Sequence, residues 1–566
     1  MTTDSPRLRS TEWFDTPELY GWLRKAAFMS QGYGPEAYEN RPIIGICNSW
    51  SELTHCNSHL RQLAEAVKRG VWQAGGFPME FPVMSLGEYN MRPTTMLFRN
   101  LMSMEVEESL RANPLDGVVL LGGCDKTTPA LLMGAASADI PAIIVTGGPQ
   151  LKANWRGEEL GSCTDCRRYE VELRAGNITG DDWAELQTCI VRSPGHCMVM
   201  GTASTMASMA EAMGIALPGN AAIPAVDSRR HRISELAGRQ IVNLVEQDLR
   251  PSQIMTREAF ENAIRTMHAL GGSTNAVIHL TAIAGRLGID LPGSLFDELS
   301  RTTPFILNLK PSGQYLMEDF FYAGGLAALL KEIAPLLHGD QMTVTGQTLA
   351  ENIAPAINYN PDIIRSMDEP MDPEGGLAVL TGSLAPTGAL IKPTAASESL
   401  MTHEGRAIVF EDHDDLFARI DDPDLDVTPD DVLVMRASGP IGAPGMPEWG
   451  FLPLPKKILA RGVRDMVRLS DARMSGTAFG PVVVHVPPES AAGGPLAAVR
   501  NGDRINLNVP ERRLDLLVED REIQRRLHES PPEKPVHKRG YASMYSQHVL
   551  QADTGCDFDF LLAEGS

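Results

Sequence analysis

The sequence predicts an α/β protein of two domains, and two features of its pattern support this. From Pro42 onward, short apolar runs alternate with segments of helical periodicity, joined by turns rich in Gly, Pro and Asn. This alternation is typical of a parallel sheet flanked by helices. Near residue 380 the helical periodicity weakens and short β-branched runs follow, which indicates a β-rich, barrel-like domain. We therefore expect an N-terminal α/β domain over residues 1–378 and a C-terminal β-rich domain over residues 379–566.

The N-terminal sheet is expected to have four strands with helices between them. The strands are expected at residues 42–47, 79–86, 118–121 and 142–146, and the helices at 57–72, 95–112 and from Pro129 onward. The polar segment 152–182 is interpreted as a long irregular surface insertion. Further helices are expected at 202–213, 230–247, 258–270, 274–287 and 320–337.

The second domain is expected to consist mainly of short strands. They are expected at 377–380, 407–410, 432–435, 482–486 and 505–509. The tail after Pro531 is polar but carries the aromatic residues Tyr541, Tyr545, Phe558 and Phe560. We expect this tail to dock onto a partner surface.

Length, charge and cysteine content narrow the class of protein. At 566 residues the chain is too long for one compact core, and its net charge of -22 argues against a nucleic-acid partner. The N-terminus lacks a signal-peptide pattern and no apolar stretch is long enough to span a bilayer. Eight cysteines are few for this length, which fits a reducing compartment. We therefore expect a cytoplasmic enzyme with no membrane partner.

The segment 116–127 is the strongest candidate for chemistry. The apolar run 118–121 ends in two glycines, and Cys124, Asp125 and Lys126 follow at once. Ligands bind at the carboxyl ends of strands in an open parallel sheet, so these three side chains point to a reactive site. The alternative interpretation is an ordinary polar turn after a strand.

Three cysteines lie near the starts of expected helices: Cys56, Cys124 and Cys197. Helix N-termini lower thiol pKa values, which suits metal-bound thiolates. Three thiolates are too few to ligate every iron of an iron-sulfur cluster, so one iron would keep an open position for substrate. Spacing alone favours the alternative of separate buried thiols. The pair Cys163 and Cys166 lies in the predicted insertion and is not expected to form the main site.

Acidic residues and one serine form a second set of candidates. Glu88 and Asp125 follow predicted strands, and Glu448 lies in the Gly- and Pro-rich segment 439–448. Carboxylates at several strand ends suit magnesium, although the ammonium of Lys126 would repel a metal unless it were modified or turned away. Ser475 precedes a glycine in a tight turn, and turn capping is its alternative role. The turn 271–275 is interpreted either as a helix cap or as an anion-binding turn.

Several motifs together resemble the family of iron-sulfur dehydratases that includes dihydroxy-acid, phosphogluconate and sugar-acid dehydratases. The matching segments are residues 47–60, 122–127, 195–197, 271–275, 439–448 and 471–477. Within that family, the segments 8–14 and 85–94 resemble the branch that acts on pentonates and hexonates, such as L-arabinonate or D-xylonate.

The resemblance implies a role for each candidate residue. It implies Cys56, Cys124 and Cys197 as ligands of a 2Fe-2S cluster, and Ser475 as the catalytic base. It also implies magnesium held by Glu88, Asp125, Glu448 and a carbamylated Lys126. The expected activity is dehydration of a sugar acid to its 2-keto-3-deoxy acid by a cytoplasmic homodimer or homotetramer.

Three rival functions remain open at this stage. A branched-chain dihydroxy acid is the nearest alternative substrate. A nucleotide-dependent oxidoreductase would fit the alternating pattern, but no Gly-x-Gly-x-x-Gly follows the first strand. A thiol sensor would explain exposed cysteines but not the carboxylates or Ser475.

Overall fold

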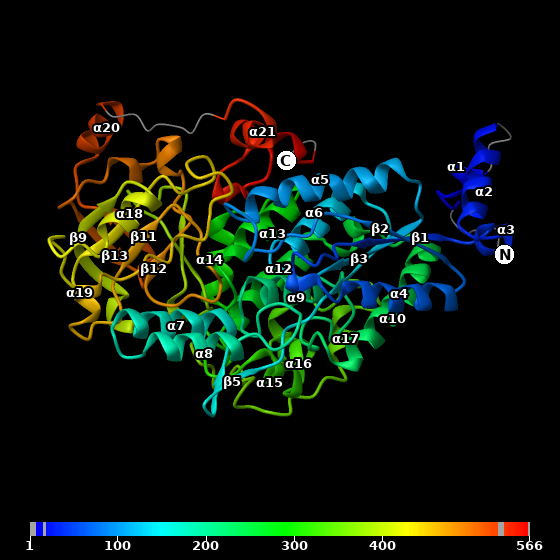
Figure 1. Cartoon of the computed structure of the whole chain (residues 1–566), viewed down its shortest axis with the longest axis horizontal. Helices are drawn as coiled ribbons and strands as arrows, with labels where there is room; N and C mark the ends of the chain where they lie inside the picture. The colour runs from blue at the N-terminus through cyan, green and yellow to red at the C-terminus, as the bar shows by residue number, and fades with distance from the viewer. Residues whose placement is uncertain (1–6, 15–18, 530–536, 564–566) are drawn as a thin grey trace.

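The computed structural model describes residues 7–14, 19–529 and 537–563, and shows an α/β region beside a β-rich region (Figure 1). The α/β region is built on a parallel sheet in the order β2-β1-β3-β4. Its strands are β1 (Ile43–Asn48), β2 (Phe77–Pro82), β3 (Gly117–Gly122) and β4 (Ala142–Thr146). Every residue of β3 is buried, which accounts for its continuous apolar run.

Helix pairs cover the two faces of this sheet (Figure 1). Helices α4 (Leu60–Gln73) and α10 (Ser228–Gln247) pack together on one face, and α5 (Met96–Ala112) and α6 (Thr127–Ala138) on the other. The α4–α10 contact depends on small residues, because a Cβ atom on Gly238 would lie 2.2 Å from the carbonyl oxygen of Val67. The predicted α/β fold class is confirmed.

The segment 152–182 is not an irregular insertion, so that prediction is wrong. It forms β5 (Ala153–Trp155), β6 (Glu158–Leu160), α7 (Ser162–Arg174) and the first turn of α8 (Gly180–Cys189). These elements share a small apolar cluster that includes Trp155, Tyr169 and Leu186. The outer face of α7 is strongly charged, which concealed the narrow apolar stripe in the sequence.

The helix predicted at 320–337 is also wrong as a single element. It is divided into α15 (Met317–Tyr322), α16 (Gly325–Glu332) and a short 3-10 turn. Gly324 and Gly325 have φ angles of 118° and 64°, a backbone conformation that interrupts a helix and favours glycine.

Of the other helices, those at 202–212, 257–270 and 275–285 lie close to their predicted places, and the rest were not predicted. In chain order, these other helices are α1 (Thr11–Phe14), α2 (Leu19–Ser30), α3 (Pro35–Tyr38), α9 (Thr202–Ala212), α11 (Pro251–Ile254), α12 (Arg257–Leu270), α13 (Asn275–Gly285), α14 (Gly293–Arg301), α17 (Leu349–Ile353), α18 (His413–Arg419), α19 (Lys456–Leu459), α20 (Asp520–Glu529) and α21 (Gly540–His548). None of the helices in the described ranges is long and apolar enough to cross a membrane.

The β-rich region contains a curved six-stranded sheet in the order β12-β11-β10-β9-β13-β14. Four neighbouring strands are parallel, and β13 pairs antiparallel with β9 and β14. Its strands are β9 (Thr402–Phe410), β10 (Val432–Met435), β11 (Arg468–Ser470), β12 (Val482–Val483), β13 (Arg504–Asn508) and β14 (Arg513–Leu516).

A hairpin connects the two edges of this sheet. It consists of β7 (Ala378–Leu380) and β8 (Ala389–Ile391). Thr381 bridges to Arg513 at one edge, and Leu390 bridges to Val484 at the other. These bridges give the region the barrel-like form that the sequence predicts. The domain boundary at 378/379 stays a prediction.

The aromatic tail folds back onto the α/β region of its own chain (Figure 1). Tyr545 and Phe558 are buried in a cluster that includes Leu97 of α5. The guanidinium of buried Arg99 donates to the carbonyl oxygens of Gly555 and Cys556 at 2.8 and 2.9 Å. The end of the chain therefore docks, as its aromatic residues predict, but on a surface within the same chain.

Candidate functional site

One cavity of about 200 Å³ lies between the carboxyl ends of the parallel strands and two loops of the β-rich region. Its lining includes every predicted site residue except Lys126. Lys126 is fully buried and contacts two of the carboxylates that line the cavity. The structure thus brings all the candidates together, although their individual roles remain predictions.

The three predicted cluster cysteines come from three separate turns. Cys56 lies in a 3-10 turn that follows β1, Cys124 follows β3, and Cys197 precedes α9. A Cβ atom on Gly123 would lie 2.8 Å from Asn57 Oδ1 and 2.9 Å from the carbonyl oxygen of Cys56. Only glycine therefore lets the Cys124 turn approach the Cys56 turn so closely.

A fourth thiol belongs to the same group, and sequence reasoning missed it. The Sγ atom of Cys163 lies 3.9 Å from Sγ of Cys197, and the Tyr89 hydroxyl lies 2.6 Å from Cys163 Sγ. Cys166, by contrast, packs against the apolar cluster beneath α7. Helical spacing alone does not separate the two cysteines, because residues three apart lie on the same side of a helix. The contact that distinguishes Cys163 is the one with Cys197, which is 34 residues away in the chain.

The crowding of these thiols changes their pKa values. Hydrogen bonding to Cys124 and burial raise the pKa of Cys56, and hydrogen bonding to Cys163 and burial raise that of Cys197. The hydrogen bond from Cys197, together with Tyr89, lowers the pKa of Cys163 to about 7 despite its burial. Several thiolates so close together repel one another, and a cationic iron centre would compensate that repulsion.

The carboxylates converge on one positive charge. The Nζ atom of Lys126 lies 2.5 Å from Asp125 Oδ2, 2.8 Å from Glu448 Oε1 and 3.6 Å from Glu88 Oε2. Within the part of the chain that the structure describes, no three His, Cys, Asp or Glu side chains are arranged to hold a metal as they stand. The donor set nevertheless fits a hard cation, because three oxygen ligands already surround one charge.

Two side chains that the sequence did not single out hold Glu448 in place. Asn275 Nδ2 donates to Glu448 Oε1 at 2.9 Å, and Arg473 Nη1 donates to the same oxygen at 3.1 Å. Arg473 also donates to Thr94, whose hydroxyl donates to Glu88 at 2.7 Å. The turn 271–275 leads into α13, where Ser273 Oγ accepts the backbone N–H of Asn275, and the Asn275 side chain orients a carboxylate of the same chain.

These contacts set the charge states of the buried groups. Burial alone would raise the pKa of Glu448, but Lys126 and Arg473 lower it to about 2. Burial and Arg473 would lower the pKa of Lys126, but Asp125, Glu448 and Glu88 together raise it above its usual value. In this state of the site the lysine is an ammonium and Glu448 is ionised.

Ser475 lies in a tight loop pressed against the α/β region. Its Oγ atom lies 2.8 Å from Thr477 Oγ1 and accepts the backbone N–H of Thr477 at 3.4 Å. A Cβ atom on Gly476 would lie 2.6 Å from Ser273 Cβ and 2.8 Å from the backbone nitrogen of Thr202. This close approach directs the serine hydroxyl into the cavity.

The fold and this cavity define an enzyme in which two regions of one chain contribute polar side chains to one reaction site. Comparison with known proteins identifies which enzyme family this is. The N-terminal model of the dihydroxy-acid/6-phosphogluconate dehydratases matches residues 41–352, and the C-terminal model matches residues 362–556. The chain belongs to this family and is a dehydratase.

Similar proteins match along nearly their full length. An L-arabinonate dehydratase of Rhizobium leguminosarum is 54% identical over 98% of this chain and 96% of its own length. An L-arabonate dehydratase of Azospirillum brasilense is 53% identical over 99% of this chain and 98% of its own. A dihydroxy-acid dehydratase of Ignicoccus hospitalis is 41% identical over 91% of this chain and 94% of its own.

Proposed function

We propose that this dehydratase converts a sugar acid, an aldonate and most specifically a pentonate, into the 2-keto-3-deoxy acid and water. The observation that carries the proposal is that Ser475, three carboxylates and four thiols line one cavity. Two similar proteins, at 54% and 53% identity, are named L-arabinonate dehydratase and L-arabonate dehydratase, which supports the sugar-acid substrate class.

We propose further that Cys56, Cys124 and Cys197 hold a 2Fe-2S cluster. Glu88, Asp125, Glu448 and a carbamylated Lys126 would hold magnesium. A carbamate would replace the ammonium by an anionic oxygen ligand among carboxylates that already converge there. When bound, these groups would make the hydrogen on carbon 2 more acidic and assist departure of the 3-hydroxyl as hydroxide.

Ser475 is the proposed base that removes the proton from carbon 2. A serine hydroxyl is a weak base, so it must react as an alkoxide and its negative charge must be stabilised. Thr477 supports this with two donors, its side-chain hydroxyl and its backbone N–H. Loss of the carbon 2 proton and of hydroxide from carbon 3 leaves an enol, which tautomerises to the 2-keto acid.

Asn275 and Arg473 act on this chemistry through Glu448. Each donates to Oε1, which fixes the orientation of this carboxylate through one of its two oxygens. Fixed ligand orientation matters because outer hydrogen bonds of this kind typically change metal affinity by roughly 10- to 100-fold.

The nearest alternative substrate is a branched-chain dihydroxy acid. A similar protein named dihydroxy-acid dehydratase is 41% identical, against 54% and 53% for two proteins named L-arabinonate and L-arabonate dehydratase. The difference favours the sugar acid for this chain.

A substrate panel tests the proposal directly. Purified protein with determined iron and sulfide content is incubated with pentonates, hexonates and 2,3-dihydroxyisovalerate, and release of 2-keto acid is measured. We expect the highest kcat/KM with a pentonate. Preference for 2,3-dihydroxyisovalerate would establish the alternative instead.

We also propose that the enzyme acts in the cytoplasm as a homodimer or homotetramer. The low cysteine content supports the compartment, and the family resemblance supports the assembly. Light scattering on the eluting protein measures the oligomeric state, and a monomer would contradict this part of the proposal.

A further inference from the structure

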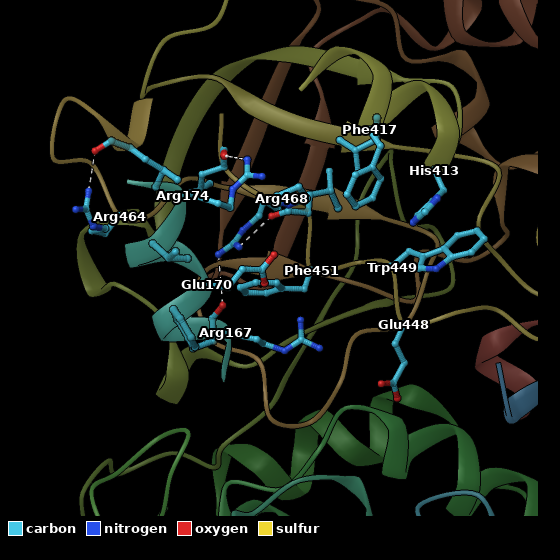
Figure 2. Close-up of a pocket in the computed structure, with 17 residues that line it drawn as sticks. Arg167, Glu170, Arg174, His413, Phe417, Glu448, Trp449, Phe451, Arg464 and Arg468 are labelled. Atoms are coloured by element: carbon cyan, nitrogen blue, oxygen red, sulfur yellow. Dashed lines mark hydrogen bonds between the residues drawn. The ribbon is translucent and has the colours of Figure 1, made fainter. Parts of the chain in front are cut away.

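A second cavity, of about 230 Å³, lies next to the proposed active site (Figure 2). Its walls come from α7 and from loops of the β-rich region. Arg167 and Glu448 line both cavities. These two side chains therefore form a wall of each cavity, and Arg167 borders both spaces.

Four arginines line the second cavity, and three of them already have acidic partners. Arg174 pairs with Asp421 at 2.9 Å, Arg464 with Glu172 at 3.2 Å and Arg468 with Asp465 at 3.0 Å.

Arg167 differs from the other three. Among the described residues it has no hydrogen-bond or ion-pair partner, and its Nε atom, like those of Arg174 and Arg468, is buried without one. Its guanidinium lies 4.9 Å from the ring centre of Phe451, and Figure 2 shows it extending past that ring toward Glu448. A cation–π contact of this kind holds the guanidinium in place and leaves its N–H groups available to a ligand.

We propose that Arg167 binds acceptor oxygens that the substrate carries beyond carbon 3, and that the second cavity receives this far end. The inference rests on the proposed function, in which the carboxylates, thiols and Ser475 engage carbons 1 to 3. The remaining carbons of a sugar acid then extend past Arg167. Their oxygens supply the partners that this guanidinium lacks.

The same arrangement would select against branched-chain acids. A substrate that ends in methyl groups would cover the Arg167 guanidinium without offering an acceptor. A buried charged donor left without a partner is costly, and sites built to bond a substrate oxygen strongly reject analogues that lack it. Arg167 is thus a specificity-determining residue.

Binding of two unreactive acids tests this without turnover. A 3-deoxypentonate keeps oxygens on carbons 4 and 5, whereas 2-hydroxybutanoate has none beyond carbon 2, and neither has a 3-hydroxyl to lose. Calorimetry on the metal-loaded protein measures both affinities. For Arg167→Gln we expect the Kd of the 3-deoxypentonate to rise roughly 10- to 100-fold, as for loss of a charged hydrogen bond. The Kd of 2-hydroxybutanoate should change less than about 2-fold.

Arg168→Gln is the matched control. Arg168 is the next residue of α7, but it pairs with Asp165 and Glu158 and lines neither cavity. This variant should bind both acids like the wild type. Arg167→Lys keeps the charge without the planar fork and serves as the second test variant if Arg167→Gln does not fold. Arg167→Lys should likewise lose more affinity for 3-deoxypentonate than for 2-hydroxybutanoate.

Substrates with different ends distinguish the two kinds of acceptor. If Arg167→Gln loses more kcat/KM with an aldarate, which ends in a carboxylate, Arg167 binds an acidic terminus. If the variant loses more kcat/KM with an aldonate, Arg167 binds hydroxyl groups. Equal losses of affinity by Arg167→Gln for 3-deoxypentonate and 2-hydroxybutanoate, or no loss for either acid, would overturn the inference.

Failure of the proposed function would give a different result. The wild-type protein would then release 2-keto acid from none of the sugar acids.

Discussion

The two regions of the chain contribute to the cavity in different ways. The α/β region contributes the three proposed cluster thiols together with Glu88, Asp125 and Lys126, most of them on turns after buried parallel strands. The β-rich region contributes Glu448 and Ser475 from two irregular loops. One region thus contributes nearly all the proposed ligands, whereas the other contributes Glu448 and the proposed base.

In the proposed mechanism this difference would assign most metal ligands to one region and the base to the other. Ligands on turns anchored by a rigid sheet are positioned accurately without help from a substrate. The loop of Ser475 has no strand of its own, and its position depends on packing of Gly476 against Ser273 and Thr202. Substitutions in the two regions should therefore fail in distinguishable ways.

Loss of a cluster ligand should have the largest effect. We expect Cys124→Ser to lose iron, acid-labile sulfide and activity together, because the thiolate is the proposed ligand. Cys189→Ser is the control, since that thiol lies at the end of α8 away from the cavity, and it should retain all three. Unchanged iron and sulfide in Cys124→Ser would refute the ligand assignment.

Removal of the base should leave the metal sites intact. We expect Ser475→Ala to lower kcat roughly 10²- to 10⁴-fold, the usual range for a proton-transfer group, with unchanged cluster absorbance. Ser109→Ala on α5, outside the cavity, should keep full activity. Near-normal turnover by Ser475→Ala would exclude it as the base.

Displacement of the Ser475 loop should have a smaller effect of the same kind. In Gly476→Ala the added methyl group has no room beside Ser273, so the loop must move. A shift on the order of 1 Å at a reacting group costs about 100-fold in rate. Gly180→Ala introduces the same methyl group where no atom lies within 4 Å and should be neutral. If Gly476→Ala instead lost iron and sulfide, the loop would also be supporting the cluster.

A buried lysine of the β-rich region should affect stability but not catalysis. Lys392 is 1% exposed, its Nζ has no hydrogen-bond partner among the described residues, and burial lowers its pKa from 10.5 to about 7. Between these two pKa values the unfolded chain binds more protons than the folded chain. The free energy of unfolding should therefore rise with pH from about 7 to 10.

Replacement by an apolar residue should remove this pH dependence. We expect Lys392→Met to be more stable at pH 7, by at most about 5 kcal/mol, and to show a flatter stability profile from pH 7 to 10. Denaturant unfolding at several pH values measures both. Lys456→Met, at an exposed lysine paired with Asp421, should keep the wild-type slope. A loss of turnover in Lys392→Met would show that the catalytic part of this region extends beyond its two loops.

The sequence predicted the elements whose burial follows from local pattern. The strand β3 is buried on both faces, so its apolar run was visible, and Cys124, Asp125 and Lys126 follow it directly. The family resemblance added Glu448 and Ser475, which no local pattern connects to that strand. The structure places all of them at one cavity.

The missed features depend on contacts between distant parts of the chain. Asn275 and Glu448 are 173 residues apart, and Arg473 and Thr94 are 379 apart. Cys163 was assigned to an insertion because the charged face of α7 obscured its helical pattern. The break at Gly324 and Gly325 arises from backbone angles that apolar periodicity does not encode.

The bond between Lys126 and Glu448 joins residues 322 positions apart, one in each region. As an ammonium, Lys126 draws the Glu448 loop toward the parallel sheet. As the carbamate of our proposal it would repel that loop, and only a cation between them would restore the attraction. Carbamylation would thus make the attraction between the two regions depend on a bound divalent cation. Melting temperature should then rise with magnesium concentration in the carbamylated protein, because a ligand that binds only the closed form stabilises it by mass action.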